Sequence, residues 1–139
     1  MPEKLLIVDD EPDMLKLLSM IIREKTHYEA VTTNNPLEAL ELAKKGGFDL
    51  VITDLKMPGL DGIELLEAIR RLDEDMPVIF ITAYGSVESA IETMQKGGFD
   101  FITKPFKKEQ ILFTIEKAVK FAALKRENRL MKEQLEKIR

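Results

Sequence analysis

Five short apolar segments alternate with five amphipathic segments along the chain, and this alternation limits the possible folds more than any other feature of the sequence. The apolar segments are residues 5–8, 28–31, 50–53, 78–82 and 99–103. Four of them are strongly apolar, whereas the second is more polar. Apolar strands with little alternation are typical of a parallel sheet that helices cover on both faces.

Between these segments, apolar residues recur at helical spacing. The pattern predicts helices over residues 12–24, 36–45, 62–72 and 86–96, and a last helix from residue 107 onward. Repeated units of a strand followed by a helix form parallel sheets with right-handed crossovers. We therefore expect an α/β fold of the flavodoxin-like type, with five parallel strands in the order 2-1-3-4-5 and an extended C-terminal helix.

The composition excludes several kinds of site. The chain has 139 residues with no cysteine and a single histidine, His27. Disulfides, thiolate metal sites and a cysteine nucleophile are therefore excluded, and neither a multi-histidine zinc site nor a Ser-His-Asp site is expected. No apolar run approaches the length of a membrane span, and no signal-peptide pattern is visible. We expect a cytoplasmic protein that does not contact a membrane.

Polar side chains follow the predicted strands at the points where the strands end. Asp9 and Asp10 follow the first strand, Asp54 follows the third, Thr82 ends the fourth and Lys104 follows the fifth. In open parallel sheets, ligands bind at the carboxyl edge where the strand order reverses, which here lies between strands 1 and 3. Three carboxylates, a hydroxyl and an amine are therefore expected to converge on one edge.

These residue types fit phosphoryl transfer. Neighbouring carboxylates repel one another unless a cation lies between them, and an open site of oxygen ligands suits Mg²⁺. One aspartate could act as a nucleophile towards phosphorus, while the hydroxyl and the ammonium could bind phosphoryl oxygens. Taken singly, each residue also has a structural interpretation, since Asp9 and Asp10 could cap the next helix, Asp54 could open a turn and Lys104 could be solvated.

The stretches around these residues resemble the signature set of response-regulator receiver domains. The matching stretches are residues 8–11 (VDDE), 54–62 (DLKMPGLDG), 81–83 (ITA) and 103–106 (TKPF), within a resemblance over residues 3–120. It implies a switch of a two-component system that accepts a phosphoryl group from the phosphohistidine of a sensor histidine kinase. By this resemblance the chain is not an ordinary enzyme, because it promotes only its own phosphorylation and dephosphorylation.

The resemblance also assigns roles to the residues of the carboxyl edge. It implies that Asp54 is the phospho-acceptor. Asp10, Asp54 and the backbone carbonyl of Lys56 would bind Mg²⁺, and Asp9 would act through a metal-bound water. Because His27 precedes a predicted strand far from these carboxylates, we interpret it as a solvated surface residue.

The remaining implied roles concern the switch. Thr82 and Lys104 would contact the phosphoryl group, and the bond between Lys104 and Pro105 is expected to be cis. Receivers of this kind switch through the threonine and an aromatic residue on the fifth strand, which here is Phe101. Phe101 has no hydroxyl, and Ala83 is small enough to leave room for the ring to move inward; the alternative is that Phe101 is a plain core residue.

The C-terminal segment differs from the rest in charge and in pattern. Residues 1–102 contain 10 Lys and Arg against 20 Asp and Glu, whereas residues 103–139 contain 11 against 5. From residue 121 the apolar spacing of 3 and 4 is that of a coiled-coil heptad, and an Asn at an a position favours a parallel dimer in register. The predicted seam consists of Phe121, Leu124, Asn128, Met131, Leu135 and Ile138.

We therefore divide the chain into a receiver domain over residues 1–120 and a helical coiled-coil linker over residues 121–139, and we expect a homodimer. A short amphipathic helix packed on its own domain is the alternative. Direct nucleic-acid contact by this segment is not expected, since its cations are interleaved with apolar residues and no arginine-rich block precedes the seam.

Residues 82–106 resemble the NtrC class of transcriptional activators, in which a receiver and a helical linker precede an AAA+ ATPase that acts on sigma-54 RNA polymerase and a DNA-binding module. The sequence contains no phosphate loop of the GxxxxGK[ST] type. We expect a receiver and linker whose output domains are missing, or alternatively a stand-alone receiver that acts by protein–protein interaction.

Two other functions compete with a switch. A Mg²⁺-dependent phosphatase with an aspartate nucleophile, of the haloacid-dehalogenase type, has a second aspartate two residues after the first, where this chain has Lys56. A flavodoxin-like electron carrier needs a phosphate-binding loop after the first strand, where the chain has Asp9, Asp10 and Glu11, which repel phosphate without a metal. Both are therefore disfavoured.

Overall fold

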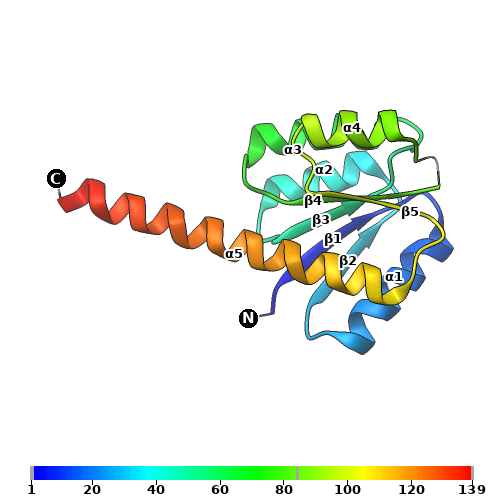
Figure 1. Cartoon of the computed structure of the whole chain (residues 1–139), viewed down its shortest axis with the longest axis horizontal. Coiled ribbons are helices and arrows are strands. Elements are labelled where there is room, and N and C mark those ends of the chain that lie inside the picture. Colours follow the sequence, from blue (N-terminus) through cyan, green and yellow to red (C-terminus); the bar gives the residue numbers. More distant parts are fainter. Residues whose placement is uncertain (1, 84, 139) are drawn as a thin grey trace.

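A computed structural model describes residues 2–83 and 85–138. Strands and helices alternate throughout, as the sequence predicts. The elements are β1 (Lys4–Val8), α1 (Pro12–Lys25), β2 (Glu29–Thr33), α2 (Pro36–Lys45), β3 (Leu50–Thr53), α3 (Gly62–Leu72), β4 (Val78–Thr82), α4 (Val87–Gln95), β5 (Asp100–Thr103) and α5 (Lys108–Ile138) (Figure 1).

The five strands form one sheet in the order β2-β1-β3-β4-β5, and every neighbouring pair is parallel. The predicted fold and strand order are therefore confirmed. The order reverses between β1 and β3, so the carboxyl ends of these two strands lie side by side with no crossover helix between them. This edge is where the sheet can hold a ligand.

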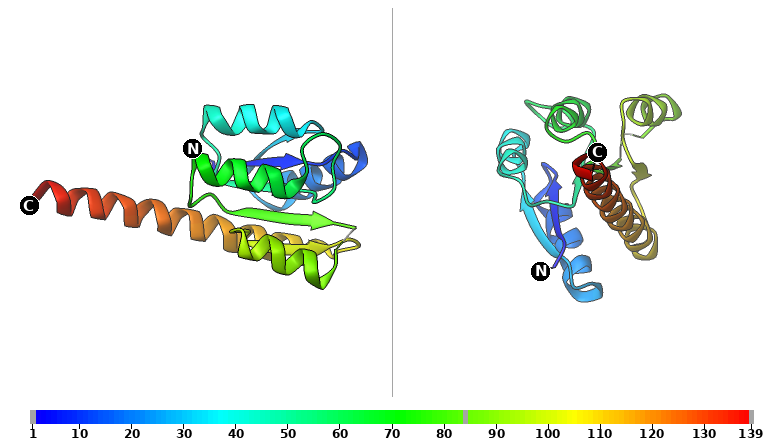
Figure 2. Two further views of the ribbon diagram at one scale, coloured as in Figure 1. Left: turned by 90° about the horizontal axis from the view of Figure 1, so that it is seen from above. Right: turned by 90° about the vertical axis from the view of Figure 1, so that its left-hand side faces the viewer.

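Helices cover the sheet on both faces (Figure 2). Alternate residues of the strands point to opposite sides, so the core consists of two layers. One layer packs β-strand residues against α1 and α5, and includes Ile7, Ile52 and Ile115. The other packs them against α2 and α3, and includes Val51 and Leu66. Because the central strands β1, β3 and β4 are buried on both faces, they have nearly continuous apolar runs, which is why the sequence pattern identifies them.

Three helices begin at side-chain caps. The side chain of Asn35 accepts from the backbone N–H of Leu37, and Asp61 and Ser86 begin α3 and α4 with reciprocal capping boxes. The N-cap residue of α1 is Glu11, whose side chain makes no capping hydrogen bond. Instead, Asp9 Oδ1 accepts from the backbone N–H of Glu11 at 2.9 Å.

Both edge strands are shifted from their predicted ranges, and β1 begins one residue earlier than predicted, at Lys4. We expected β2 over residues 28–31, but it spans Glu29–Thr33, since its pairing with β1 continues to Val8 opposite Thr33. A pattern of apolar residues misses such polar ends on an edge strand. At the other edge β5 begins at Asp100 rather than at Phe99. These shifts are at element ends, where hydrogen bonding rather than hydrophobicity sets the limit.

The last helix is one continuous element that extends beyond the sheet. α5 runs from Lys108 to Ile138 without interruption at residue 120, and its second half extends beyond the body (Figure 1). Its buried residues lie between Ile111 and Val119. In the described part of the chain, no helix has both the length and the apolar character that crossing a membrane requires.

Candidate functional site

The carboxyl ends of β1, β3 and β5 bring three ionisable side chains into contact. Asp9 and Asp54 directly follow β1 and β3, and each is 2% exposed. The Lys104 Nζ lies 3.1 Å from Asp9 Oδ2 and 3.2 Å from Asp54 Oδ2, so its ammonium bridges the two carboxylates. Asp54 and Asp9 precede Lys104 by 50 and 95 positions in the sequence. Residues from distant parts of the chain therefore form one buried charge cluster.

Two exposed carboxylates complete an acidic cluster at the mouth of this edge. Ligand oxygens of Asp9, Asp10, Glu11 and Asp54 all lie within 4.8 Å of one another. Glu11 was not among the predicted site residues, although it belongs to the VDDE stretch. A cavity of about 570 Å³ opens beside the cluster, and it is lined by Asp10, Glu11, Asp54, Lys56, Met57, Pro58 and Asp61.

The backbone that follows β3 orients the Asp54 carboxylate. Asp54 Oδ1 accepts hydrogen bonds from the backbone N–H groups of Leu55 and Lys56 at 2.6 and 3.2 Å, while Oδ2 accepts from Lys104. The loop is held by Gly62, whose backbone N–H donates to the carbonyl of Leu55 at 2.9 Å. The side chain of Asp54 is thereby fixed at the edge of the cavity before any ligand arrives.

The electrostatics of the cluster reflect burial and pairing. Burial raises the pKa of Asp9 above its usual 3.8, against the opposing effects of the Glu11 backbone N–H and of Lys104. The pKa of Lys104 is also raised: burial lowers it, but the hydrogen bonds and charges of Asp9 and Asp54 outweigh that effect. Lys104 is therefore firmly cationic at neutral pH, whereas the negative charge of Asp9 is unfavourable in the folded state.

Replacing Asp9 by Asn should stabilise the protein in the presence of a chelator. A carboxyl whose folded pKa is raised contributes stability that is complete below its unfolded pKa and is lost as the pH rises through the folded pKa. At neutral pH the charge of Asp9 thus opposes folding, and Asp9→Asn should raise the free energy of unfolding.

Thermal unfolding at pH 7 and at pH 3 measures this effect. The gain should shrink at the lower pH, where Asp9 is protonated in both states. Asp13→Asn, at an exposed position on α1, is the control and should leave the melting temperature nearly unchanged. A lower melting temperature for Asp9→Asn at pH 7 would contradict the conclusion that the buried charge of Asp9 opposes folding.

The two predicted switch residues lie on neighbouring strands. Thr82 ends β4 with no exposed surface, and its backbone carbonyl accepts from the N–H of Lys104 at 2.9 Å. Phe101 on β5 is half-buried and stacks on Phe80, with ring centroids 6.4 Å apart. A Cβ atom at Gly85 would lie 2.9 Å from the Phe101 ring, so the loop after β4 closely approaches this ring.

Other predicted features are found where the sequence placed them. The peptide bond between Lys104 and Pro105 is cis. His27 is exposed and pairs with Glu3, with Nε2 and Oε2 3.1 Å apart, far from the acidic cluster in the fold.

Phe121 differs from the rest of the predicted seam, because it is half-buried and its ring centroid lies 5.2 Å from that of Phe99. It therefore packs against the body formed by the sheet and its helices.

Comparison with known proteins agrees with this geometry. Residues 5–116 match the family described as the response regulator receiver domain. The chain is 38% identical over 122 residues to the transcriptional regulatory protein GlrR of Escherichia coli strain K12; the match covers 88% of this chain but only 27% of that protein. It is also 38% identical over 117 residues to sporulation initiation phosphotransferase F of Bacillus subtilis strain 168, covering 84% of this chain and 94% of that protein.

Among solved structures, the beryllofluoride-activated NtrC4 receiver domain dimer matches with a TM-score of 0.81 and 34% identity, over 86% of this chain and 98% of that one. The family match spans most of the chain and includes the acidic cluster, Thr82 and Lys104. The chain therefore belongs to the family of response regulator receiver domains.

Proposed function

We propose that this chain is the phosphoryl-accepting switch of a two-component response regulator, with Asp54 as the acceptor. The observation that carries the proposal is the setting of the Asp54 carboxylate. It is buried, oriented by two backbone N–H groups, in contact with a lysine ammonium, and adjacent to an acidic cluster that borders a cavity. The phosphoryl donor is a phosphohistidine on a sensor histidine kinase.

The acidic cluster fits Mg²⁺. Its donors are all oxygens, and Mg²⁺ prefers a few carboxylates together with phosphate oxygens in an open site. Asp10, Asp54 and the backbone carbonyl of Lys56 would hold the ion, with Asp9 beside them. When bound, the ion supplies positive charge that offsets both the carboxylates and the incoming phosphoryl oxygens.

The residues of this chain supply the remaining requirements of the transfer. A carboxylate oxygen of Asp54 attacks phosphorus, the bond from phosphorus to the histidine nitrogen breaks, and its electron pair leaves with the imidazole. The Lys104 ammonium and the Thr82 hydroxyl stabilise the charge on the phosphoryl oxygens. The chain acts only on itself in this reaction, including its later dephosphorylation.

The phosphorylated state must differ in its contacts for a switch to operate. A phosphoryl group adds negative charge and strong acceptors, and it shifts a conformational equilibrium only through contacts that differ between the two states. Lys104 already binds Asp9 and Asp54, so a phosphoryl group competes for its ammonium. We infer that Thr82 moves towards the phosphoryl group and that Phe101 follows into the space that Thr82 vacates.

The output of the switch is transcription, by analogy with its relatives. The amino-acid sequence of residues 82–106 resembles that of the NtrC class, and the relatives that match this chain include the transcriptional regulatory protein GlrR. We propose an AAA+ domain that activates sigma-54 polymerase, followed by a DNA-binding module, as the output that this segment controls. A stand-alone receiver is the second candidate, since sporulation initiation phosphotransferase F is matched over 94% of its length.

The test of phosphorylation uses a small phosphodonor such as acetyl phosphate. With Mg²⁺ present, intact-mass spectrometry should show the gain of one phosphoryl group, and a chelator should abolish that gain. Multiple turnover of small phosphate esters would instead support the phosphatase interpretation.

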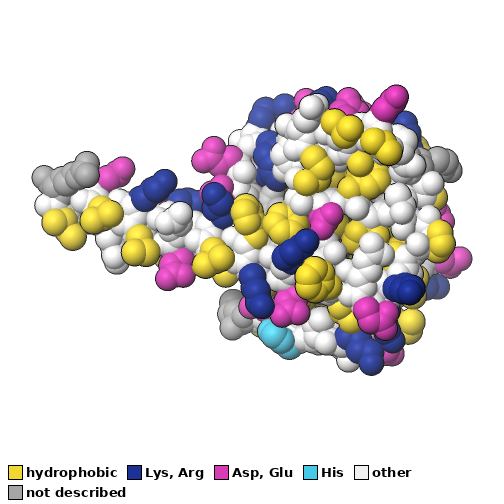
Figure 3. All heavy atoms as spheres, viewed as in Figure 1, with side chains coloured by type: hydrophobic (Ala, Val, Ile, Leu, Met, Phe, Trp, Pro, Cys, Tyr) yellow, Lys and Arg dark blue, Asp and Glu magenta, His cyan; other side chains and the backbone are white. Residues whose placement is uncertain are grey.

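The exposed seam on α5 supports a homodimer. Leu124, Met131, Leu135 and Ile138 are between 57% and 81% exposed and recur at heptad spacing on α5. Figure 3 shows hydrophobic side chains along one side of the extension. A row of exposed apolar residues at heptad spacing is what a parallel coiled coil buries. The similar NtrC4 receiver was solved as a dimer.

Sedimentation equilibrium of seam variants tests the dimer. The double variant Leu124→Glu/Leu135→Glu should be monomeric at concentrations where the unchanged chain is dimeric, because it places charges in the seam. Leu130→Glu is the matched control, since Leu130 is 56% exposed on the same helix but lies off the seam. If the unchanged chain is monomeric at high concentration with and without phosphorylation, the coiled-coil proposal is wrong.

A further inference from the structure

A repeated pentapeptide places the same two side chains at two corners of the sheet. The sequence Lys-Gly-Gly-Phe-Asp occurs at residues 45–49 and 96–100, just before β3 and at the start of β5. Both corners lie at the amino edge of the sheet, opposite the acidic cluster. α5 runs back across the sheet towards this edge and continues past it (Figure 1).

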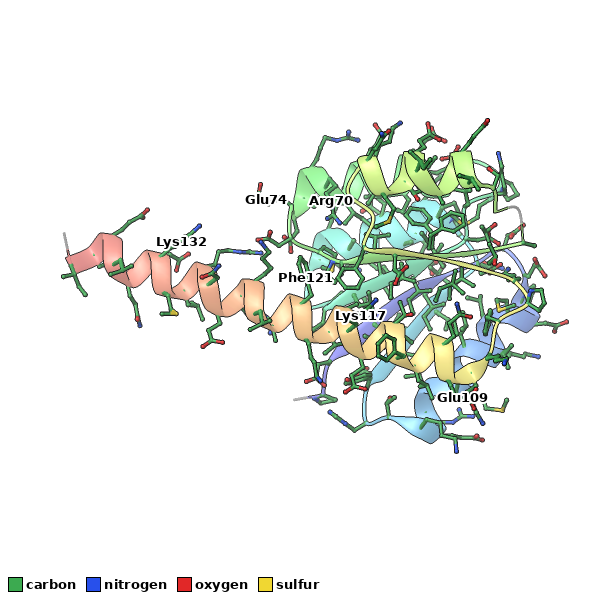
Figure 4. The ribbon with its side chains drawn as sticks, viewed as in Figure 1. Arg70, Glu74, Glu109, Lys117, Phe121 and Lys132 are labelled. Carbon is green, nitrogen blue, oxygen red and sulfur yellow. The ribbon has the colours of Figure 1, made fainter. Side chains whose placement is uncertain are left out.

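Both corners contact α5. At the second corner, the Lys117 Nζ lies 3.3 Å from Asp100 Oδ2 and 5.9 Å from the centre of the Phe99 ring, which also packs on Phe121. Figure 4 labels Lys117 and Phe121, which come from successive turns of α5 beside the body. This corner therefore holds the first half of the helix.

The first corner contacts the part of α5 that leads out of the body. Arg126 forms an ion pair with Asp49. One turn later, Arg129 pairs with two carboxylates of the turn between α3 and β4: its Nη2 lies 2.8 Å from Asp75 Oδ2 and 3.3 Å from Asp73 Oδ1. We call Asp49, Asp73 and Asp75 the acidic corner.

The acidic corner is itself held in place. Arg70, labelled in Figure 4 near the end of α3, donates to the backbone carbonyls of Asp73 and Gly97 at 3.0 and 2.8 Å. The backbone N–H of Asp75 donates to Asp73 Oδ1 at 2.9 Å. The acidic corner and residues Ala122, Arg126 and Arg129 of α5 together line a cavity of only about 70 Å³, so the helix lies close against the corner. α5 therefore packs against a surface whose conformation is fixed by hydrogen bonds.

The two arginines lie on the side of α5 opposite the seam. With 3.6 residues per turn and Phe121 at a heptad a position, Arg126 and Arg129 occupy positions f and b. Pairing them with the acidic corner turns the seam outward. In Figure 3, hydrophobic and basic side chains follow different sides of the extension.

We propose that Arg126 and Arg129 are positioning residues that clamp α5 to the acidic corner and so fix the direction of the linker and the face that its seam presents to a second copy of the chain. Single exposed ion pairs contribute little, but these act together on one rigid helix that Phe121 already anchors. The role in presenting the seam rests on the proposed dimer, whereas the clamp itself is a property of a single chain.

Hydrogen exchange of the unphosphorylated full chain, followed by mass spectrometry, tests the clamp. In the double variant Arg126→Gln/Arg129→Gln, the amides of residues 122–130 should exchange about tenfold faster, as expected for the joint loss of exposed ion pairs. Exchange in β1 and β3 should not change. Arg126→Lys/Arg129→Lys keeps both charges and should restore most of the protection.

The control is Lys132→Gln/Lys137→Gln, which removes two charges from the same helix. Within the described residues 2–83 and 85–138, neither lysine takes part in an ion pair, and Lys132 lies on the extension beyond the body (Figure 4). Exchange within twofold of the unchanged chain for the arginine double variant, or equal acceleration by the lysine control, would overturn the clamp.

Sedimentation of the same samples separates this test from that of the dimer. If the chain does not dimerise while the arginine variant still exchanges faster, the seam proposal is wrong and the clamp stands. If the chain dimerises while the arginine variant exchanges at the unchanged rate, the clamp is wrong and the seam stands.

Discussion

Asp54→Asn should abolish the gain of a phosphoryl group from acetyl phosphate and Mg²⁺. The amide of asparagine cannot act as a carboxylate nucleophile, and no acyl phosphate can form on it. The surrounding geometry should survive, because Asn has the same shape and its carbonyl oxygen can still accept from Leu55 and Lys56, which now hold Asp54 Oδ1 at 2.6 and 3.2 Å. Intact-mass spectrometry measures the outcome directly.

A matched control distinguishes this site from phosphorylation of other carboxylates. Asp13→Asn removes an exposed carboxylate of α1 outside the acidic cluster, and this variant should still gain one phosphoryl group. Circular dichroism should show that both variants are folded. An equal gain of mass by Asp54→Asn would refute the acceptor assignment and would require a different carboxylate of the acidic cluster.

Gly62→Ala should be the most destabilising single-methyl change at the site. A Cβ at this position would lie 2.3 Å from the backbone oxygen of Asp54 and 2.9 Å from the Cα of Leu55. Both atoms belong to the backbone, so no flexible side chain can move aside, and either α3 or the loop after β3 must shift. We expect a loss of about 3 kcal/mol in the free energy of unfolding, at the upper end for an overpacked site.

Chemical denaturation measures this loss, and a second glycine provides the comparison. Gly47 has a φ of +90°, and a Cβ atom added there would meet nothing within 4 Å, so Gly47→Ala introduces backbone strain without a clash. It should cost about 1 kcal/mol. If the two substitutions destabilise equally, the close approach of Gly62 to Asp54 does not limit the packing of this loop.

Gly62→Ala should also slow phosphorylation, since the displaced backbone is the one that orients the Asp54 carboxylate. The same phosphodonor assay, run at a temperature where the variant is folded, reports this effect. It links the packing of α3 to the chemistry of the site.

Most of the fold can be predicted from local patterns in the sequence. The three central strands β1, β3 and β4 are buried on both faces, so their apolar runs identify them without knowledge of their neighbours. The alternation of strands with helices then favours the strand order. The edge strand β2 was misplaced because its ends are polar and are defined by hydrogen bonds to β1. The site residues could be named because strand ends in a parallel sheet share one edge.

The architecture and the residues at the carboxyl edge of the sheet are predictable from the amino-acid sequence alone, because hydrophobic periodicity and the order of the elements are properties of the chain. The contacts between side chains that are distant in sequence are visible only in the folded structure. The ammonium of Lys104 lies between Asp9 and Asp54, Gly62 abuts the Asp54 backbone, and Arg126 and Arg129 reach carboxylates of other elements. Such contacts depend on the distances between packed elements, and no periodicity within a segment encodes those distances.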